Sequence, residues 1–214
     1  MSKRQNHREE IFEKILEAAE IEFGLKGYNG ASLQHIAERA GLPKPNIIYY
    51  FQSKANLYKS VLDQTLMGWN DLFDRATLED DPAIVLDRFI REKLKQSFEK
   101  PGTSRLFAME VIGGALHIGD YLKQELQPWF ASRMALLQGW MDAGRMRSCD
   151  PASVIYMIWA TTQHYADFEA QVLALSGVTS LEDTDLQRIG DTVSGIILTG
   201  CGLTLPTSEP SSNT

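Results

Sequence analysis

Apolar residues recur along this chain at the three- and four-residue spacing of an α-helix. No stretch alternates polar and apolar residues for long enough to indicate a half-buried strand, so the pattern predicts an all-α fold of about nine helices. We expect the first helix to end at Gly24 and Gly27, because glycine readily adopts the left-handed conformation that follows a helix. The apolar positions of this helix are Ile11, Ile15, Ala18, Ala19 and Phe23.

Two short helices follow the first one. Ser32 is suited to cap the second helix, and Gly41 supplies the left-handed residue after it. Pro43 and Pro45 stand where the third helix begins, because the first turn of a helix does not use the N–H that proline lacks. The apolar residues of these two helices are Leu33, Ile36, Ala37, Ala40, Ile47, Ile48 and Phe51.

Helical spacing continues through most of the remaining chain. Ser53 can cap a fourth helix whose apolar positions extend to Phe73, and the acidic residues 78–82 end it. We divide the chain into a three-helix domain (1–52), a larger helical domain (53–204) and a tail (205–214) whose composition predicts disorder. The further helices of the larger domain are expected at 83–99, 104–117, 120–142, 151–175 and 185–201.

The two short helices and their glycine turn have the pattern of a DNA-binding helix-turn-helix. The run from Gly27 to Leu62, GYNGASLQHIAERAGLPKPNIIYYFQSKANLYKSVL, resembles the DNA-binding domain of the TetR family. The shared features are a glycine-rich lead-in, S-x-x-x-I-A-x-x-A-G, a short helix that ends in aromatic residues, and Ser53-Lys54. The resemblance implies a dimeric transcriptional regulator, most often a repressor, with a palindromic double-stranded DNA operator and a small-molecule effector.

The N-terminal turn of a recognition helix enters the major groove, so Lys44, Pro45 and Asn46 are the candidates to face base edges. Asn46 can pair with adenine through two hydrogen bonds. Tyr49, Tyr50 and Lys54 resemble the family's phosphate-contacting residues, and we add Ser32 to this DNA-binding set. The alternative for each tyrosine is packing against the first helix, and for Lys54 it is a solvated charge.

Two positions depart from the family's pattern. Pro43 stands where the family usually has a Ser or Thr cap, and Ile48 stands where it usually has a tyrosine. Loss of the cap is expected to weaken the third helix by about 1 kcal/mol. Operator contacts at position 48 are therefore not transferred to this chain.

Charge is distributed unevenly along the sequence. The formal net charge is -7, but residues 1–60 contain nine Lys or Arg against seven Asp or Glu, and residues 61–214 contain twelve against twenty-one. Binding to a polyanion requires clustered Lys and Arg. The N-terminal quarter is therefore the part of the chain that suits contact with DNA.

Residues 104–115 (SRLFAMEVIGGA) and 157–172 (MIWATTQHYADFEAQV) resemble TetR-family regulators of pyrimidine utilisation, which respond to uracil and thymine. Trp159 and Gln163 share a helical face, where an indole can cover a flat ring and an amide can pair with a lactam edge. Trp69 and Phe107 are further ligand-binding candidates. The alternatives are that Trp159 and Gln163 are core or interface residues, and that the effector is an apolar, multidrug-type compound.

A dimer is expected to form through the helix at 151–175 and the last helix, in a four-helix interface across a twofold axis. The apolar stripe of that last helix consists of Ile189, Val193, Ile196 and Ile197. Such a dimer would place its two recognition helices about 34 Å apart, which suits a palindromic operator.

Other classes of protein find little support. The chain has no apolar stretch of membrane-spanning length, no secretory signal and only two cysteines, so we expect a cytoplasmic protein without membrane contact. Common enzyme motifs are absent, and no cofactor is expected. His164 and Asp167 are too few to hold a metal. Glu110, in a mostly apolar helix, is a candidate acid or base without an accompanying nucleophile.

Overall fold

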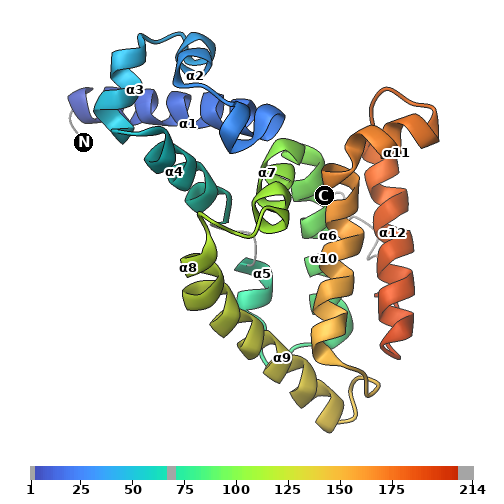
Figure 1. Ribbon diagram of the computed structural model, residues 1–214. Coiled ribbons are helices and arrows are strands. Elements are labelled where there is room, and N and C mark those ends of the chain that lie inside the picture. Colours follow the sequence, from blue (N-terminus) through green and yellow to red (C-terminus); the bar gives the residue numbers. More distant parts are fainter. Residues whose placement is uncertain (1–2, 67–70, 207–214) are drawn as a thin grey trace. The chain divides into compact units, whose positions relative to one another are not determined.

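Figure 1 shows the computed structural model, which describes residues 3–66 and 71–206, with side chains for 5–64 and 73–206. Within these ranges the regular elements are helices and no strand occurs, which confirms the predicted all-α fold class. The chain forms two compact units. Unit 1 contains α1 to α4 with α7 and α8, and unit 2 contains α5, α6 and the remaining helices. These units do not coincide with the predicted domains 1–52 and 53–204.

Unit 1 is built on α1 (Lys3–Gly30), against which α2 (Leu33–Ala40) and α4 (Lys54–Leu66) pack. The helix continues through Gly24, contrary to the prediction that it ends there. Its backbone leaves the helical conformation at Gly27, as predicted, where a φ of 65° suits glycine and kinks α1. A Cβ at Gly24 would lie 3.2 Å from the carbonyl oxygen of Gly102, so glycine permits close approach here. The other helices of unit 1 are α3 (Lys44–Phe51), α7 (Pro101–Ile112) and α8 (Gly119–Tyr121).

Unit 2 is centred on α6 (Pro82–Glu99), which packs against α10 (Pro151–Asp167) and α12 (Asp183–Gly200). Asp81 and Asp150 cap α6 and α10 by accepting backbone N–H bonds at 2.8 Å, and a proline follows each cap. The other elements are α5 (Asp71–Asp74), a π-helix (Leu122–Leu126), α9 (Gln127–Asp142) and α11 (Glu169–Ser176).

Several predicted helices are divided or shifted. The helix expected at 120–142 consists of α8, the π-helix and α9, and Pro128 at the start of α9 cannot continue a preceding α-helix. The helix expected at 151–175 breaks at Phe168, between α10 and α11. The helix expected at 104–117 begins at Pro101 and ends at Ile112, before residues with positive φ at Gly114 and Ala115. Apolar spacing locates a buried face but does not detect such local breaks.

Candidate nucleic-acid interface and effector region

The turn between α2 and α3 is fixed by local hydrogen bonds. The Ser32 hydroxyl accepts the N–H of His35 at 3.1 Å and caps α2, as predicted. Gly41 has a φ of 65° and ends α2, and the next N–H, from Leu42, donates to the carbonyl of Ala37 at 3.0 Å. These contacts fix the point at which α3 leaves α2.

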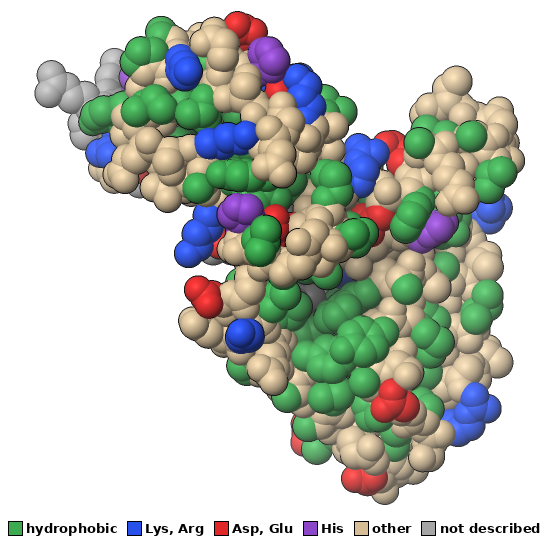
Figure 2. All heavy atoms as spheres, in the orientation of Figure 1, with side chains coloured by type: hydrophobic (Ala, Val, Ile, Leu, Met, Phe, Trp, Pro, Cys, Tyr) green, Lys and Arg blue, Asp and Glu red, His purple; other side chains and the backbone are tan. Residues whose placement is uncertain are grey.

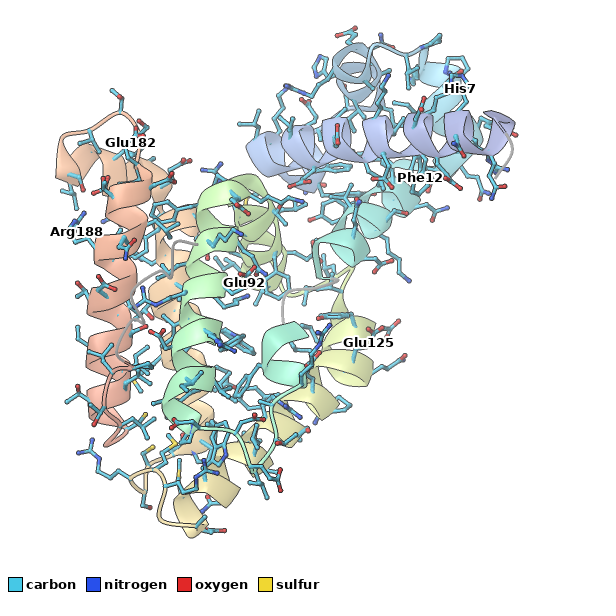
Figure 3. All side chains as sticks on the ribbon, turned by 180° about the vertical axis from the view of Figure 1, so that it is seen from behind. His7, Phe12, Glu92, Glu125, Glu182 and Arg188 are labelled. Atoms are coloured by element: carbon cyan, nitrogen blue, oxygen red, sulfur yellow. The ribbon has the colours of Figure 1, made fainter. Side chains whose placement is uncertain are left out.

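One face of α3 is buried and anchors the helix. Ile47 and Phe51 are buried, and the Phe51 ring stacks on that of Phe12 from α1, with ring centres 4.9 Å apart. Phe12 is labelled on α1 in Figure 3. Lys44 and Pro45 are exposed at the N-terminal end of α3, and Asn46 beside them is half-buried. Pro43 occupies the N-cap position of α3 and makes no side-chain hydrogen bond to the helix.

The two tyrosines of α3 differ in their surroundings. Tyr49 is 72% exposed and packs edge to face on Tyr50, with ring centres 5.3 Å apart. Tyr50 is half-buried, 6.4 Å from the ring of Phe12, and the Arg8 guanidinium lies 6.0 Å from its ring centre. Packing on α1 therefore applies to Tyr50, while Tyr49 is available at the surface.

Lys54 at the start of α4 is held in place by neighbours. Its ammonium lies 4.8 Å above the ring of Tyr28 and donates to the carbonyl of Asn29 at 3.5 Å. The hydroxyl of Ser53 accepts the N–H of Asn56 at 3.1 Å, so Ser53 caps α4 as predicted. The charge of Lys54 is therefore positioned at the same end of unit 1 as the glycine-rich lead-in.

A buried acid that the sequence pattern did not predict lies against α2. Glu22 of α1 is 1% exposed, and its carboxylate lies 2.9 Å from Lys26, 3.2 Å from His35 and 3.8 Å from Arg39. Burial acts to raise the pKa of Glu22, but the hydrogen bonds and charges of Lys26 and His35 outweigh burial and lower this pKa. The sequence could have indicated this burial, because Glu22 stands next to Phe23 on the apolar face of the first helix.

Glu110 joins two parts of unit 1. Its carboxylate accepts the hydroxyl of Tyr58 at 2.9 Å and the backbone N–H of His117 at 2.6 Å. Burial and the bond to Glu110 raise the pKa of Tyr58 well above its usual value. The rings of Tyr28 and His117 lie 4.5 Å apart. These contacts give Glu110 a structural role between α4 and the segment after α7.

The predicted ligand-binding residues lie in different parts of the chain. Phe107 is half-buried on α7 of unit 1, whereas Trp159 and Gln163 are half-buried on α10 of unit 2. Trp69 lies outside the described residues. Figure 2 shows apolar side chains gathered at the surface beside α10.

Trp159 belongs to an aromatic cluster within unit 2. Its ring stacks on that of Trp129 from α9, with centres 5.9 Å apart and planes at 20°. Phe73 links Trp129 to Phe89 of α6, with ring centres 6.0 Å and 4.8 Å apart. Phe130 contacts Trp159 at 5.8 Å. We define the aromatic cluster as Phe73, Phe89, Trp129, Phe130, Tyr156 and Trp159.

The apolar stripe of α12 is mainly buried in the core of unit 2, contrary to the prediction that it forms a dimer interface. Ile189, Val193 and Ile197 are buried against α6 and α10, and only Ile196 is exposed, at 70%. Apolar spacing identifies a buried face but does not show which helix covers it.

Two further observations concern membrane spans and metal sites. In the ranges 3–66 and 71–206 no helix is both long and apolar enough to cross a membrane. The same ranges contain no group of three or more His, Cys, Asp or Glu that can hold a metal ion. His164 instead stacks on Phe168, with ring centres 4.9 Å apart.

An anchored helix-turn-helix together with a second helical unit defines a class of all-helical DNA-binding proteins, and this chain belongs to the TetR family. Residues 15–61 match the family profile described as bacterial regulatory proteins, tetR family, and residues 62–204 match the profile described as YcdC-like protein, C-terminal region. The match confirms the resemblance found between Gly27 and Leu62. The protein is therefore a DNA-binding transcriptional regulator.

Individual relatives agree with this assignment. The HTH-type transcriptional regulator RutR of Escherichia coli strain K12 is 39% identical over 186 residues, which cover 87% of this chain and 88% of RutR. The ketosteroid transcriptional regulator KstR2 of Mycobacterium tuberculosis has a TM-score of 0.67 at 17% identity, with 91% of this chain and 94% of KstR2 covered. A TetR-like regulator from Rhodococcus sp. RHA1 has a TM-score of 0.65 at 16% identity, with coverage of 89% and 94%. The two solved structures share the fold, and these relatives are regulators of transcription, not enzymes.

Proposed function

We propose that this protein is a repressor that binds a palindromic operator as a dimer and responds to a pyrimidine-like compound such as uracil or thymine. In this role it controls the breakdown of pyrimidines in the cytoplasm. The observation that carries the DNA-binding part is the division of α3 into a buried face and an exposed end. Ile47 and Phe51 anchor the helix, while Lys44, Pro45 and Tyr49 are exposed.

Each DNA-binding residue has a defined role in this proposal. Lys44, Pro45 and Asn46 read base edges, because they occupy the first turn of the recognition helix. Tyr49, Tyr50 and Lys54 contact phosphates, and the contact of Lys54 with Tyr28 holds its charge in position. Ser32 contributes at the start of α2, where its hydroxyl also serves as the cap.

The outward faces of α10 and α12 support a dimer. Met157 and Ile196 are exposed apolar residues, and the neighbouring exposed positions are the small Ala160, Thr161 and Thr199. Small and apolar residues allow helices of two protomers to approach closely in a four-helix interface. The dimer surface therefore consists of these outward positions and not of the buried stripe of α12.

The effector assignment rests on α10. Trp159 is part of the aromatic cluster, and Gln163 follows it by one helical turn with an amide that donates and accepts. The resemblance of residues 104–115 and 157–172 to regulators of pyrimidine utilisation supports the same ligand class. An apolar, multidrug-type effector is the competing possibility, because the cluster itself is apolar.

The test starts from an operator selected from random double-stranded DNA by the purified full-length protein. We then measure operator affinity with and without uracil, thymine and a set of apolar compounds. Release of DNA by uracil or thymine alone supports the proposal, and release by apolar compounds alone supports the competing effector. Gln163→Ala is expected to abolish the response to uracil without changing operator affinity, whereas an unchanged response would place Gln163 in the core.

A further inference from the structure

One face of α6 carries an aromatic ring, a cation and an amide at successive turns. Phe89, Lys93 and Gln96 are spaced i, i+4 and i+7 and therefore share a face of the helix. Phe89 belongs to the aromatic cluster through its contact with Phe73. Lys93 and Gln96 thus follow the cluster by one and two turns. Glu92 marks this part of α6 in Figure 3.

Lys93 is buried to an extent that is rare for lysine. Its exposed fraction is 3%, and burial lowers its pKa to about 8, although the charge of Asp167 on α10 acts in the opposite direction. Burial of an ammonium group reduces the stability of the fold. An apolar residue at this position would stabilise the fold more, so a lysine here points to a functional role. The position of Lys93 beside the aromatic cluster indicates a use in binding.

Gln96 offers an acceptor beside this cation. Its amide nitrogen donates to the Glu92 carboxylate at 3.4 Å, while its Oε1 is buried and has no hydrogen-bond donor among the described residues. A buried carbonyl oxygen without a donor has lost its hydrogen bonds to water without replacement, which is unfavourable. An N–H group of a bound ligand would remove this cost.

Gln163 on α10 occupies a position along its helix that corresponds to that of Lys93 on α6. Phe89 of α6 and Trp159 of α10 belong to the aromatic cluster, and further along the two helices Phe98 and Tyr165 have ring centres 6.2 Å apart. The two helices therefore run in the same direction. Gln163 lies one turn after Trp159 on α10, as Lys93 lies one turn after Phe89 on α6. Each helix therefore carries polar side chains in the turns that follow its residue of the aromatic cluster.

We propose that Lys93 and Gln96 recognise the polar edge of a planar cyclic imide. Lys93 donates to a ring carbonyl oxygen, Gln96 Oε1 accepts the imide N–H, and the aromatic cluster contacts the ring. This assignment rests on the proposed pyrimidine response and adds the chemical feature that is read, the CO–NH–CO unit. An apolar compound is expected to bind poorly at this place, because it would leave the buried Gln96 Oε1 without a donor.

The experiment measures dissociation constants by isothermal titration of the full-length protein with uracil, 1-methyluracil and 3-methyluracil. The first two ligands keep the imide N–H and the third lacks it, so this comparison requires no variant. Lys93→Met and Gln96→Leu are each expected to weaken uracil binding roughly ten- to a hundredfold. Lys95→Met is the matched control, because Lys95 is exposed on the same helix and pairs with Glu99. Circular dichroism verifies that each variant is folded.

The proposal expects 3-methyluracil to bind much more weakly than 1-methyluracil and Lys95→Met to behave as the wild type. Equal binding of the two methylated ligands would overturn it. If Lys93→Met and Gln96→Leu bind uracil normally and uracil still releases operator DNA, the assignment to α6 is wrong while the proposed function stands. If the wild type binds none of the imides, the imide site and the pyrimidine response are both wrong.

Discussion

The two units differ in how many of their buried polar side chains have hydrogen-bond partners. In unit 1 the buried carboxylates of Glu22 and Glu110 accept hydrogen bonds from several donors, most of which lie on other helices or loops. In unit 2 Lys93 is buried with a lowered pKa. The buried side-chain atoms that have no partner among the described residues all lie in unit 2, and they are Gln96 Oε1, Arg133 Nε, Trp140 Nε1 and Ser194 Oγ.

This difference matches the tasks that we propose for the two units, DNA binding for unit 1 and ligand binding for unit 2. A DNA-reading surface must hold exposed side chains in fixed positions, and satisfied polar networks make the scaffold beneath them rigid. A ligand site needs polar groups that find their partners only when the ligand is bound. The contrast suggests that polar groups stabilise unit 1 and reduce the stability of unit 2 in the absence of ligand.

Glu110→Leu tests the first half of this contrast. The substitution removes the acceptor of the Tyr58 hydroxyl and of the His117 N–H, so it is expected to reduce the free energy of unfolding by about 3–4 kcal/mol. Urea unfolding followed by circular dichroism measures this loss. Glu79→Leu is an exposed control and should change stability little. A loss below about 1 kcal/mol for Glu110→Leu would show that the network does not support unit 1.

Lys93→Met tests the expectation for unit 2. It should increase the free energy of unfolding, whereas Glu110→Leu should reduce it. Burial lowers the pKa of Lys93 from 10.5 to about 8, so the charged form is penalised in the folded protein at neutral pH. The penalty is largest below pH 8 and disappears as the pH rises toward 10.5, where lysine in the unfolded chain is also neutral. Without ligand the variant should gain on the order of 2–3 kcal/mol at pH 7 and less at pH 10. Destabilisation at pH 7 would show that Lys93 supports the fold.

Asn46→Ala and Lys54→Ala separate base reading from phosphate contact on the surface of unit 1. Asn46→Ala should cost about 1–3 kcal/mol on the selected operator and little on unrelated DNA. Lys54→Ala should weaken binding to all sequences alike and reduce its salt dependence, because it removes the proposed phosphate contact. Fluorescence anisotropy at several salt concentrations measures both. Equal losses for both variants on every sequence would contradict the assigned roles.

Glu22→Gln tests how much the ion pairs of Glu22 stabilise unit 1, which is the smallest of the expected effects. Because the pKa of Glu22 is lowered in the folded protein, its ion pairs stabilise unit 1 above the ordinary pKa of glutamate. This contribution is lost as the pH falls through the lowered value. The wild type should exceed the variant by about 1 kcal/mol at pH 7, since Lys26, His35 and Arg39 are partly solvated. The difference should vanish in acid, and a difference that persists would exclude ion pairing as its cause.

The sequence determined the local features of this protein. Ser32, Gly41 and Ser53 were correctly predicted as caps, because a cap depends on hydrogen bonds within four residues. The TetR motif was recognisable for the same reason, since its glycines, aromatic residues and Ser-Lys pair stand at fixed distances along the chain. The exposed end of α3 followed directly from the burial of Ile47 and Phe51.

Only the tertiary structure decided which polar residues are buried and what they contact. Lys93 has the same local pattern as any lysine on an amphipathic helix, and its burial results from the packing of α6 against α10 and α12. Glu110 was identifiable as an unusual acid, but its partners Tyr58 and His117 come from other segments. Spacing along one helix defines its faces, whereas the environment of each face depends on which distant helix packs there.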